Sequence, residues 1–268
     1  MARILVTGGT GALGSAVVNH LKSTDDHVRL LSRKPAPADL ESGIEWARGD
    51  IASGVGLIEA LKNVDIVVNC TGDGKNVYET DVLGVKRLAK SAKQAGVHHF
   101  FHISIVGIER IDLDYYRHKV SAEAAVIDSG VPYSIQRVTQ FHTLLDFIIS
   151  KLKGSSEGYI LPIAHDALFQ LIDTRDVTAY IAPFLTAEPV GRLPDVGGSE
   201  ILRVAEIART YLKARGIDNP AFVDPEKGFF PPSAVEAFRQ GINTVPENRY
   251  GQITWADYVG EMVSSYIE

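Results

Sequence analysis

The chain begins ARILVTGGTGALG (residues 2–14), an apolar run followed at once by a glycine-rich turn. Ala2–Val6 is predicted to be a strand, and Leu13–Lys22 carries apolar residues at helical spacing. Glycines between a strand and a helix permit a tight turn, let the backbone approach a pyrophosphate and bring helix and strand together. The helix N-terminus adds unpaired N–H groups that face the anion. We therefore expect a dinucleotide to bind at Thr7, Gly8, Gly9, Thr10, Gly11, Ala12, Leu13 and Gly14; the alternative is a glycine-rich turn without a ligand.

The following segments repeat this alternation of strand and helix, which is typical of βαβ units in a parallel sheet. Further strands are predicted at Val28–Leu31, Ile44–Trp46, Ile66–Cys70, Phe100–Ile103 and Tyr133–Arg137. They are largely apolar, as expected of parallel strands covered on both faces. Helices are predicted at Gly56–Leu61, Val82–Ala95 and Tyr115–Asp128. The predicted fold class is α/β, a Rossmann-type doubly wound parallel sheet with a smaller C-terminal substrate lobe.

After Arg137 the pattern changes. The spacing predicts a helix over Phe141–Lys151, a break at Gly154–Ser156, and short strands at Tyr159–Ile163 and Leu168–Ile172. We therefore predict a dinucleotide-binding domain over residues 1–137 and a substrate-binding lobe over 138–268. A segment at about 166–196 is expected to return to the first domain.

The composition is that of a soluble globular protein, with 45% hydrophobic and 22% charged residues. A net charge of −6, without a long run of Lys or Arg, argues against binding to nucleic acid or an anionic membrane. The single cysteine, Cys70, cannot form an internal disulfide. No signal peptide is evident, and no apolar segment approaches the ~18 residues of a membrane span. We expect a cytoplasmic protein with a small-molecule partner; the oligomeric state does not follow from the sequence.

The end of the second predicted strand indicates which dinucleotide binds. NAD sites usually carry an acidic residue there, whereas NADP sites carry a base. Here the chain reads Ser32-Arg33-Lys34, and a guanidinium at Arg33 would clamp a 2′-phosphate. NADP, with NADPH favoured over NADH, is the expected cofactor; the alternative is that Arg33 is an exposed loop residue.

Tyr115 and Lys119 form a YxxxK pattern, which places both side chains on one face of a helix. An ammonium beside a phenol favours the phenolate, so the tyrosine can pass its proton to a carbonyl oxygen while a nicotinamide delivers hydride. The alternative is an amphipathic helix on which Glu123, one turn further along, pairs with Lys119.

Several short motifs accompany these residues: Gly49-Asp50-Ile51, Asn69-Cys70-Thr71-Gly72, Asp81 with Gly84, Ala95-Gly96-Val97 leading into Ile103-Ser104, and Ser129-Gly130-Val131-Pro132. With the glycine loop, they resemble the short-chain dehydrogenase/reductase superfamily, in particular its atypical NmrA-like NAD(P)-binding branch. Phe238-Arg239-Gln240-Gly241 and Thr254-Trp255 look like a bacterial group within that branch.

The resemblance implies roles for individual residues. The counterpart of Asp50 meets the adenine, and the loop after the fourth strand passes the adenosine ribose. Ser104 would hydrogen-bond the substrate carbonyl, and Lys119 would bind the nicotinamide ribose. The further cofactor contacts expected are Ile51, Cys70, Thr71, Gly72 and Val138. The interval from Ser104 to Tyr115 is shorter than is usual in the superfamily, and many NmrA-like proteins lack the tyrosine, so the role of Tyr115 stays open.

A substrate pocket is expected between the carboxyl ends of the strands and the second lobe. Its expected lining includes Val106, Phe141, His142, Phe169 and Phe230. An apolar and aromatic wall suits an uncharged carbonyl, quinone or enone, although such aromatics are also common core residues. His98, His99 and His102 crowd the fifth strand, with His99 on the opposite face from the other two. Without an HExxH helix or a cysteine cluster we predict no metal site.

Two functions remain open. In the first, the protein is an NADPH-dependent oxidoreductase with Tyr115 as acid, Lys119 as its electrostatic partner and Ser104 as carbonyl ligand. In the second, it is a non-catalytic redox sensor of the NmrA type that binds NADP(H) and signals to a protein partner.

Overall fold

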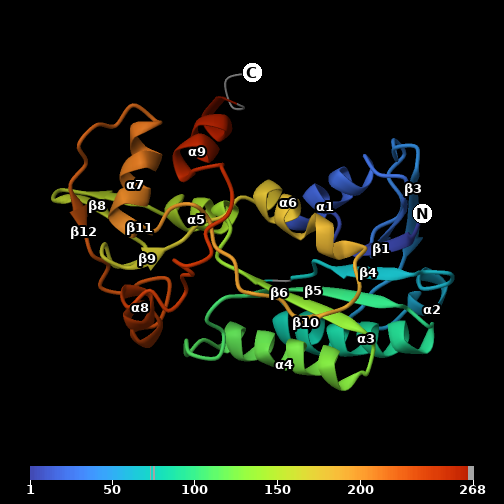
Figure 1. Ribbon diagram of the computed structural model, residues 1–268. Coiled ribbons are helices and arrows are strands. Elements are labelled where there is room, and N and C mark those ends of the chain that lie inside the picture. The colour runs from blue at the N-terminus through green and yellow to red at the C-terminus, as the bar shows by residue number, and fades with distance from the viewer. Residues whose placement is uncertain (73, 75, 265–268) are drawn as a thin grey trace. The chain divides into compact units, whose positions relative to one another are not determined.

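The computed structural model describes residues 1–72, 74 and 76–264, and the chain divides into two compact units (Figure 1). Unit 1 consists of Met1–Ser104, Asp114–Arg137 and Val177–Pro194. Unit 2 consists of Ile105–Leu113, Val138–Asp176 and Asp195–Glu268. The last four residues of the predicted second lobe lie outside the described residues.

Unit 1 is built on a parallel sheet of seven strands in the order β10-β6-β5-β4-β1-β2-β3. The strands are β1 (Arg3–Thr7), β2 (His27–Ser32), β3 (Ile44–Arg48), β4 (Ile66–Asn69), β5 (His99–Ile105), β6 (Tyr133–Val138) and β10 (Gly191–Arg192). The chain moves outward from β1 to β3 and then returns to β4 on the other side of β1. This reversal creates a crevice at the carboxyl ends of β1 and β4, where doubly wound sheets bind their ligands. The predicted Rossmann-type fold is confirmed.

Helices cover both faces of this sheet. They are α1 (Ala12–Leu21), α2 (Leu57–Ala60), α3 (Val85–Gln94), α4 (Asp114–Asp128) and α6 (Thr174–Leu185). Figure 1 shows α3 and α4 on one face and α1 and α6 on the other. Leu5, Val67 and Phe100 of the sheet are buried in one apolar cluster with Leu88 of α3 and Val126 of α4. The apolar periodicity of these helices reflects the face that each one packs on the sheet.

One predicted helix begins earlier than its apolar pattern indicated. A π-helical segment, η1 (Tyr78–Gly84), precedes α3, whereas the sequence predicted a single helix from Val82. The inward face of η1 includes the buried polar residues Thr80 and Asp81. A search for apolar spacing does not detect a helical turn whose buried side chains are polar.

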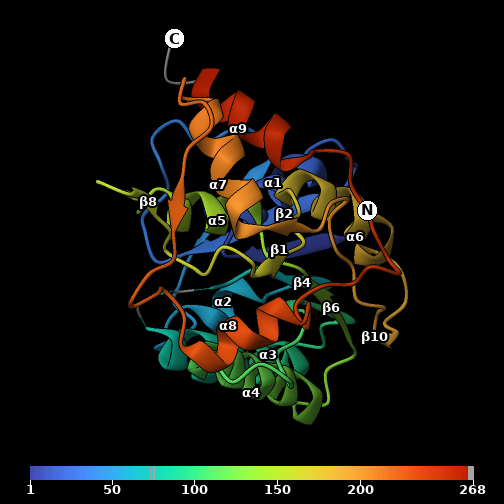
Figure 2. The same cartoon turned by 90° about the vertical axis from the view of Figure 1, so that its left-hand side faces the viewer.

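Within its described residues, unit 2 contains two small sheets and four helices. Strands β7 (Lys153–Ser155), β8 (Gly158–Ile160) and β12 (Phe222–Val223) form one sheet, and β9 (Leu168–Phe169) pairs with β11 (Leu202–Arg203) in the other. The helices are α5 (His142–Ile149), α7 (Val204–Lys213), α8 (Pro232–Arg239) and α9 (Trp255–Ser264). In Figures 1 and 2, α7 and α9 lie side by side, and Trp255 Nε1 donates a hydrogen bond to the Ile207 carbonyl at 2.9 Å.

The predicted break at Gly154–Ser156 is wrong in part, because this segment belongs to a β-hairpin. Residues 153–155 pair with β8 in antiparallel fashion, and Ser155 Oγ donates a hydrogen bond to the Gly158 carbonyl at 2.7 Å. Such a three-residue strand depends on its partner strand and leaves no alternation for local pattern analysis to detect.

Candidate functional site

An open pocket of about 520 Å³ lies at the carboxyl ends of β1, β2 and β4 in unit 1. Its lining consists of Thr7, Gly8, Thr10, Gly11, Leu31, Ser32, Arg33, Gly49, Asp50, Ile51, Cys70, Thr71, Gly72, Gly74 and Thr80. A volume of this size is in the range of small-molecule and cofactor sites. The pocket therefore coincides with the position at which a Rossmann sheet holds its dinucleotide.

The glycine loop at this pocket tolerates no side chain at two positions. Gly8 has a φ of +69°, and a Cβ there would lie 2.6 Å from the carbonyl oxygen of Cys70. A Cβ on Gly14 would lie 2.1 Å from the carbonyl oxygen of Gly8. Helix α1 begins after Gly11 without a side-chain cap and without an acidic residue in its first turn. The loop thus packs tightly on β4 and leaves the helix N-terminus to an anion such as a pyrophosphate.

The predicted cofactor residues divide into two groups in the structure. Those that line the pocket are Thr7, Gly8, Thr10, Gly11, Ser32, Arg33, Asp50, Ile51, Cys70, Thr71 and Gly72. Those outside its lining are Gly9, Ala12, Leu13, Gly14, Lys34, Lys119 and Val138. Gly9 and Leu13 pack inward instead: a Cβ on Gly9 would meet the Leu30 side chain at 2.8 Å, and Leu13 is buried.

Sequence reasoning missed four lining residues. Leu31 and Gly49 directly precede the predicted contacts Ser32 and Asp50. Extending each predicted contact by one residue along the chain would have included both. Gly74 and Thr80 follow β4; the family resemblance implies that the loop there passes the adenosine ribose, but it singles out neither residue.

Directly after β2, the positively charged side chain of Arg33 lines the pocket. Arg33 is exposed and lines the pocket beside Ser32. The backbone here is held by two hydrogen bonds: the Lys34 N–H donates to Ser32 Oγ at 3.2 Å, and Trp46 Nε1 donates to the Lys34 carbonyl at 3.0 Å. Among the lining residues Asp50 is the single acid, and its Oδ1 accepts the Ala52 N–H at 3.0 Å. Arg33 thus places a guanidinium at the end of β2.

Beside the pocket, Tyr115 and Lys119 of α4 meet Asp81 of η1. Lys119 is 5% exposed and Asp81 is fully buried, and Lys119 Nζ lies 3.2 Å from Asp81 Oδ2. The same Nζ is 5.5 Å from the centroid of the Tyr115 ring. Burial by itself would lower the pKa of Lys119, but interactions with Tyr115 and Asp81 outweigh it and raise that pKa. The centre thus holds a buried ammonium beside a phenol.

The hydroxyl of Tyr115 lies against the wall of the pocket. A Cβ placed on Gly72, which lines the pocket, would be 3.9 Å from the Tyr115 hydroxyl oxygen. The phenol is therefore adjacent to the segment that follows β4.

The alternative pairing of Lys119 with Glu123 is wrong. Glu123 is instead bound by Arg137 of β6, with Nε to Oε1 at 2.7 Å and Nη2 to Oε2 at 2.6 Å. Both Glu123 and Arg137 are buried. Helical spacing allowed the pair on α4, but the sheet supplies Glu123 with a bidentate guanidinium, which is the stronger partner for a buried carboxylate.

Strand β5 carries two buried polar residues, Ser104 and His102. Ser104 is 1% exposed, and among the described residues its Oγ has no hydrogen-bond partner. His102 is also 1% exposed, and its Nδ1 lies 2.9 Å from Asn69 Nδ2. Burial, and secondarily the charge of Lys119, lowers the pKa of His102 to about 3. From the sequence, we considered His102 only as a metal ligand. A polar side chain in a largely apolar, buried strand could have indicated that it belongs to the site.

The thiol of Cys70 at the same edge is held in its protonated form. Cys70 lines the pocket, and burial raises the pKa of its thiol to about 12. The thiolate form that attacks or binds metals is therefore absent near neutral pH.

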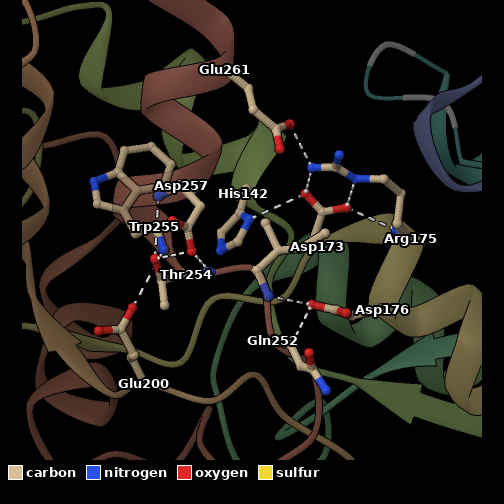
Figure 3. Close-up of polar contacts among 11 residues, drawn as sticks. His142, Asp173, Arg175, Asp176, Glu200, Gln252, Thr254, Trp255, Asp257 and Glu261 are labelled. Atoms are coloured by element: carbon tan, nitrogen blue, oxygen red, sulfur yellow. Dashed lines mark hydrogen bonds and ion pairs between the residues drawn. The ribbon is translucent and has the colours of Figure 1, made fainter.

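In unit 2, the predicted substrate residue His142 stands in a polar cluster of its own (Figure 3). Its Nδ1 faces Asp173 Oδ2 at 3.5 Å, and its ring packs on Tyr258 with centroids 5.1 Å apart. Arg175 holds both oxygens of Asp173 and also binds Glu261 of α9 at 2.8 Å. Burial would raise the pKa of Asp173, but His142 and Arg175 outweigh it and hold that pKa well below its usual range. The His142 ring is thus fixed by a carboxylate and an aromatic neighbour.

The other predicted substrate residues also belong to unit 2. Phe169 is fully buried and Phe230 is half-buried, and both rings pack on Phe238, with centroids 5.0 and 5.1 Å away. Val106 is buried and Phe141 is half-buried. Their contact with a substrate stays a prediction.

The described part of the chain holds neither a metal-ligand cluster nor a membrane-spanning helix. In residues 1–72, 74 and 76–264, no group of three or more His, Cys, Asp or Glu side chains is placed to hold a metal ion. Within the same residues, none of the helices combines the length and apolar character needed to span a membrane.

Comparison with known proteins identifies the family. Residues 8–144 match the model of the NAD(P)H-binding family, which covers half of the chain. The chain belongs to the NAD(P)H-binding family. It is 31% identical over 251 residues to a protein of Streptomyces griseus named (4-alkanoyl-5-oxo-2,5-dihydrofuran-3-yl)methyl phosphate reductase, covering 88% of this chain and 85% of that protein. It is 25% identical to the divinyl chlorophyllide a 8-vinyl-reductase of Cucumis sativus, over 73% of this chain and 52% of that enzyme.

Two enzymes whose solved structures hold a dinucleotide share the fold. The Escherichia coli quinone oxidoreductase QOR2 with NADPH superposes with a TM-score of 0.75 at 17% identity, covering 99% of this chain and 100% of that one. The Bordetella bronchiseptica enzyme WbmH with NAD+ superposes with a TM-score of 0.73 at 13% identity, covering 100% of this chain and 99% of that one. Family membership and the reductase relatives support an NAD(P)H-dependent oxidoreductase acting on a small molecule.

Proposed function

We propose that the protein is an NADPH-dependent reductase of the NmrA-like branch that reduces a carbonyl, enone or quinone. The observation that carries this proposal is the position of Tyr115: its hydroxyl lies against pocket-lining Gly72, and the buried Lys119 ammonium lies beside its ring. A positioned proton donor next to a dinucleotide pocket is what the reduction of a polarised double bond requires.

The residues take separate roles in the reaction. When bound, NADPH supplies a hydride to the electrophilic carbon of the substrate. Ser104 donates a hydrogen bond to the substrate oxygen, and Tyr115 transfers its proton to that oxygen as negative charge develops there. Lys119 stabilises the phenolate that remains, and solvent then restores the proton of Tyr115. Asp81 keeps Lys119 protonated inside the protein.

The preference for NADPH rests on the corner of the pocket after β2. Arg33 lines the pocket there, and the lining residues that precede it in the chain, Leu31 and Ser32, carry no carboxylate to accept a ribose 2′-hydroxyl; the lining acid Asp50 follows β3 instead. A guanidinium binds a phosphate with paired hydrogen bonds, so it favours the 2′-phosphate of NADPH.

The substrate class rests on two supports. The expected wall of the substrate pocket is apolar and aromatic, which suits an uncharged reacting group. The Streptomyces griseus relative is named as the reductase of an alkanoyl- and oxo-substituted dihydrofuranylmethyl phosphate, whose ring double bond is polarised by carbonyl groups. We infer that the reacting group here is likewise conjugated to, or is itself, a carbonyl.

The test is a screen for NADPH oxidation with aldehydes, cyclic enones and quinones, followed by comparison of Tyr115→Phe with the native protein. Loss of the proton donor should lower kcat by roughly 10²- to 10⁴-fold and leave the affinity for NADPH unchanged. Tyr116→Phe is the matched control, because the next residue of a helix points about 100° away from Tyr115. Undiminished turnover by Tyr115→Phe would refute the proton role.

A redox sensor is the second candidate, and one observation favours it. The lining of the pocket does not include Tyr115, Lys119 or Ser104, so the nucleotide pocket is formed without the reaction centre. A sensor would oxidise no NADPH in the screen, would bind NADP+ and NADPH with different affinities, and would bind a protein partner in only one of the two states.

A further inference from the structure

A row of buried polar side chains crosses three adjacent strands of the unit 1 sheet. Thr7 of β1 is the register partner of Asn69 of β4, which is in turn the register partner of His102 of β5. All three are buried. Thr7 Oγ1 donates a hydrogen bond to Asn69 Oδ1 at 2.6 Å, and Asn69 Nδ2 lies 2.9 Å from His102 Nδ1. The row therefore joins the start of the glycine loop to the strand that carries Ser104.

This row determines which nitrogen of His102 carries the proton. The backbone N–H of Thr71 points to Asn69 Oδ1 at 3.2 Å, and a backbone N–H can only donate. The oxygen of the Asn69 amide is thereby identified, so its NH₂ group faces His102. An amide NH₂ also only donates, and His102 Nδ1 must accept. The proton of the neutral ring is therefore on Nε2, which becomes a hydrogen-bond donor.

The row ends at His102, whose Nε2–H group has no hydrogen-bond partner among the described residues. Among the described residues, His102 Nε2 and Ser104 Oγ are both buried without a hydrogen bond. They are two residues apart on β5 and so extend from the same face of the sheet. More than nine in ten buried polar groups in proteins are paired, and leaving one unpaired is costly. Two unpaired donors on one face of the same strand indicate an acceptor that comes from outside the chain.

We propose that His102 and Ser104 form a subsite for an oxygen atom of a bound ligand. The hydrogen bonds of Thr7 and Thr71 orient the Asn69 amide, which holds His102 as the donor tautomer. The inference rests on the proposed function and adds His102 to the residues that bind the ligands. The oxygen belongs either to a ribose hydroxyl of the dinucleotide or to the substrate carbonyl; both accept a hydrogen bond. A neutral imidazole stabilises such an oxygen without placing a second cation beside Lys119.

The row also connects this subsite with the cofactor pocket. Thr7 and Thr71 line the pocket, and Thr71 Oγ1 donates a hydrogen bond to Thr7 Oγ1 at 2.9 Å. A ligand that moves either threonine changes the hydrogen bond that orients the Asn69 amide. We therefore expect occupancy of the pocket to alter the His102 ring signals.

His99 provides a matched control. It lies on the same strand, is 2% exposed, and has a partner of its own, with Nε2 2.8 Å from Ser134 Oγ. Its position three residues before His102 places it on the opposite face of the sheet. Substitution of His99 therefore tests the loss of a buried, hydrogen-bonded histidine without touching the subsite.

The first experiment is long-range ¹H–¹⁵N NMR of the histidine rings in the full-length protein, with His102→Gln used to assign the His102 signals. We expect His102 to be the neutral, Nε2-protonated tautomer at neutral pH. A change in its Nε2–H signal on addition of NADP+ alone assigns the oxygen to the cofactor. A change that needs both NADP+ and 2-cyclohexen-1-one assigns it to the substrate. An Nδ1-protonated ring, or no change although calorimetry shows NADP+ bound, would overturn the subsite.

The second experiment measures binding and turnover in three variants. His102→Leu should weaken NADP+ binding or lower kcat/KM by about tenfold or more, because it removes the donor. His102→Gln keeps a neutral amide donor and should recover most of that loss, whereas His99→Leu should change neither value. Equal losses in His102→Leu and His99→Leu would mean that the effect is structural and would overturn the proposal. Absence of NADP+ binding in the native protein would instead refute the proposed function, while the NMR tautomer still tests the row.

Discussion

Replacing Asp81 with asparagine should destabilise the protein strongly, because it leaves the Lys119 ammonium buried without its carboxylate. Lys119 is 5% exposed, Asp81 is fully buried, and their charged atoms are 3.2 Å apart. Removing one partner of a buried ion pair typically costs about 3–5 kcal/mol, since the remaining charge is left desolvated. We expect the free energy of unfolding at pH 7 to fall by about 3 kcal/mol in Asp81→Asn.

The native protein and Asp81→Asn should also differ in how the free energy of unfolding changes with pH. In the native protein the pKa of Lys119 is raised, so its contribution to stability is complete below the unfolded pKa of ~10.4 and is lost only as the pH rises beyond that value. Lys119 therefore adds no slope between pH 7 and 9. In Asp81→Asn the interaction with Tyr115 remains, and we expect burial to outweigh it and to lower the pKa of Lys119 below its unfolded value. The unfolded state then binds more protons, and stability rises with pH by up to about 1.4 kcal/mol per pH unit.

The assay is urea unfolding of the native protein, Asp81→Asn, Lys119→Met and the double variant at pH 7, 8 and 9. Lys119→Met should recover much of the loss in the Asp81→Asn background, because no buried charge then remains. Glu59→Gln, which disrupts the exposed pair of Glu59 with Lys62, is the control and should change stability by about 0.5 kcal/mol or less. A loss below about 1 kcal/mol in Asp81→Asn, with the native slope against pH, would refute the assigned pairing.

Further predictions concern the cofactor, the fold and the response to acid. Arg33→Glu should reverse the preference from NADPH to NADH in parallel calorimetric titrations; an unchanged preference would remove Arg33 from the 2′-phosphate. Gly14→Ala should abolish binding of both nucleotides and lower the melting temperature, because its Cβ would lie 2.1 Å from the Gly8 oxygen; normal binding would contradict the tight loop. The pKa of His102 is lowered to about 3, so the unfolded state takes up its proton first, and stability should fall from about pH 6.5 downward, with a smaller fall in His102→Gln. The pKa of Asp173 is also lowered, so its contribution should persist above the unfolded pKa of ~3.9 and be lost in acid; melting curves of Asp173→Asn should show a flatter acid limb, and an identical limb would count against the Asp173 contacts.

Much of unit 1 could be predicted because its signals are local. The alternation of apolar runs and helical spacing identified the six principal strands of the sheet to within two residues at each end, and the glycines after β1 located the pocket. The short strand pairs of unit 2 were harder to predict from the sequence. Strands β7 and β12 have three and two residues, too few to show an alternating pattern, and β12 pairs with a strand far away in the chain. Likewise, η1 was missed because the residues that it buries include Thr80 and Asp81.

The sequence by itself determined the parts of the site that depend on backbone geometry and on neighbours along the chain. Glycine is required where a Cβ would strike a carbonyl, as at Gly14, and helical spacing alone places Tyr115 and Lys119 on one face. Only the tertiary structure decided that Lys119 pairs with Asp81 rather than Glu123, and that His102 bonds to Asn69. These pairings depend on which side chains tertiary packing brings together, η1 with α4 and β4 with β5, from segments more than thirty residues apart. Burial then determines which charge or tautomer each of them adopts.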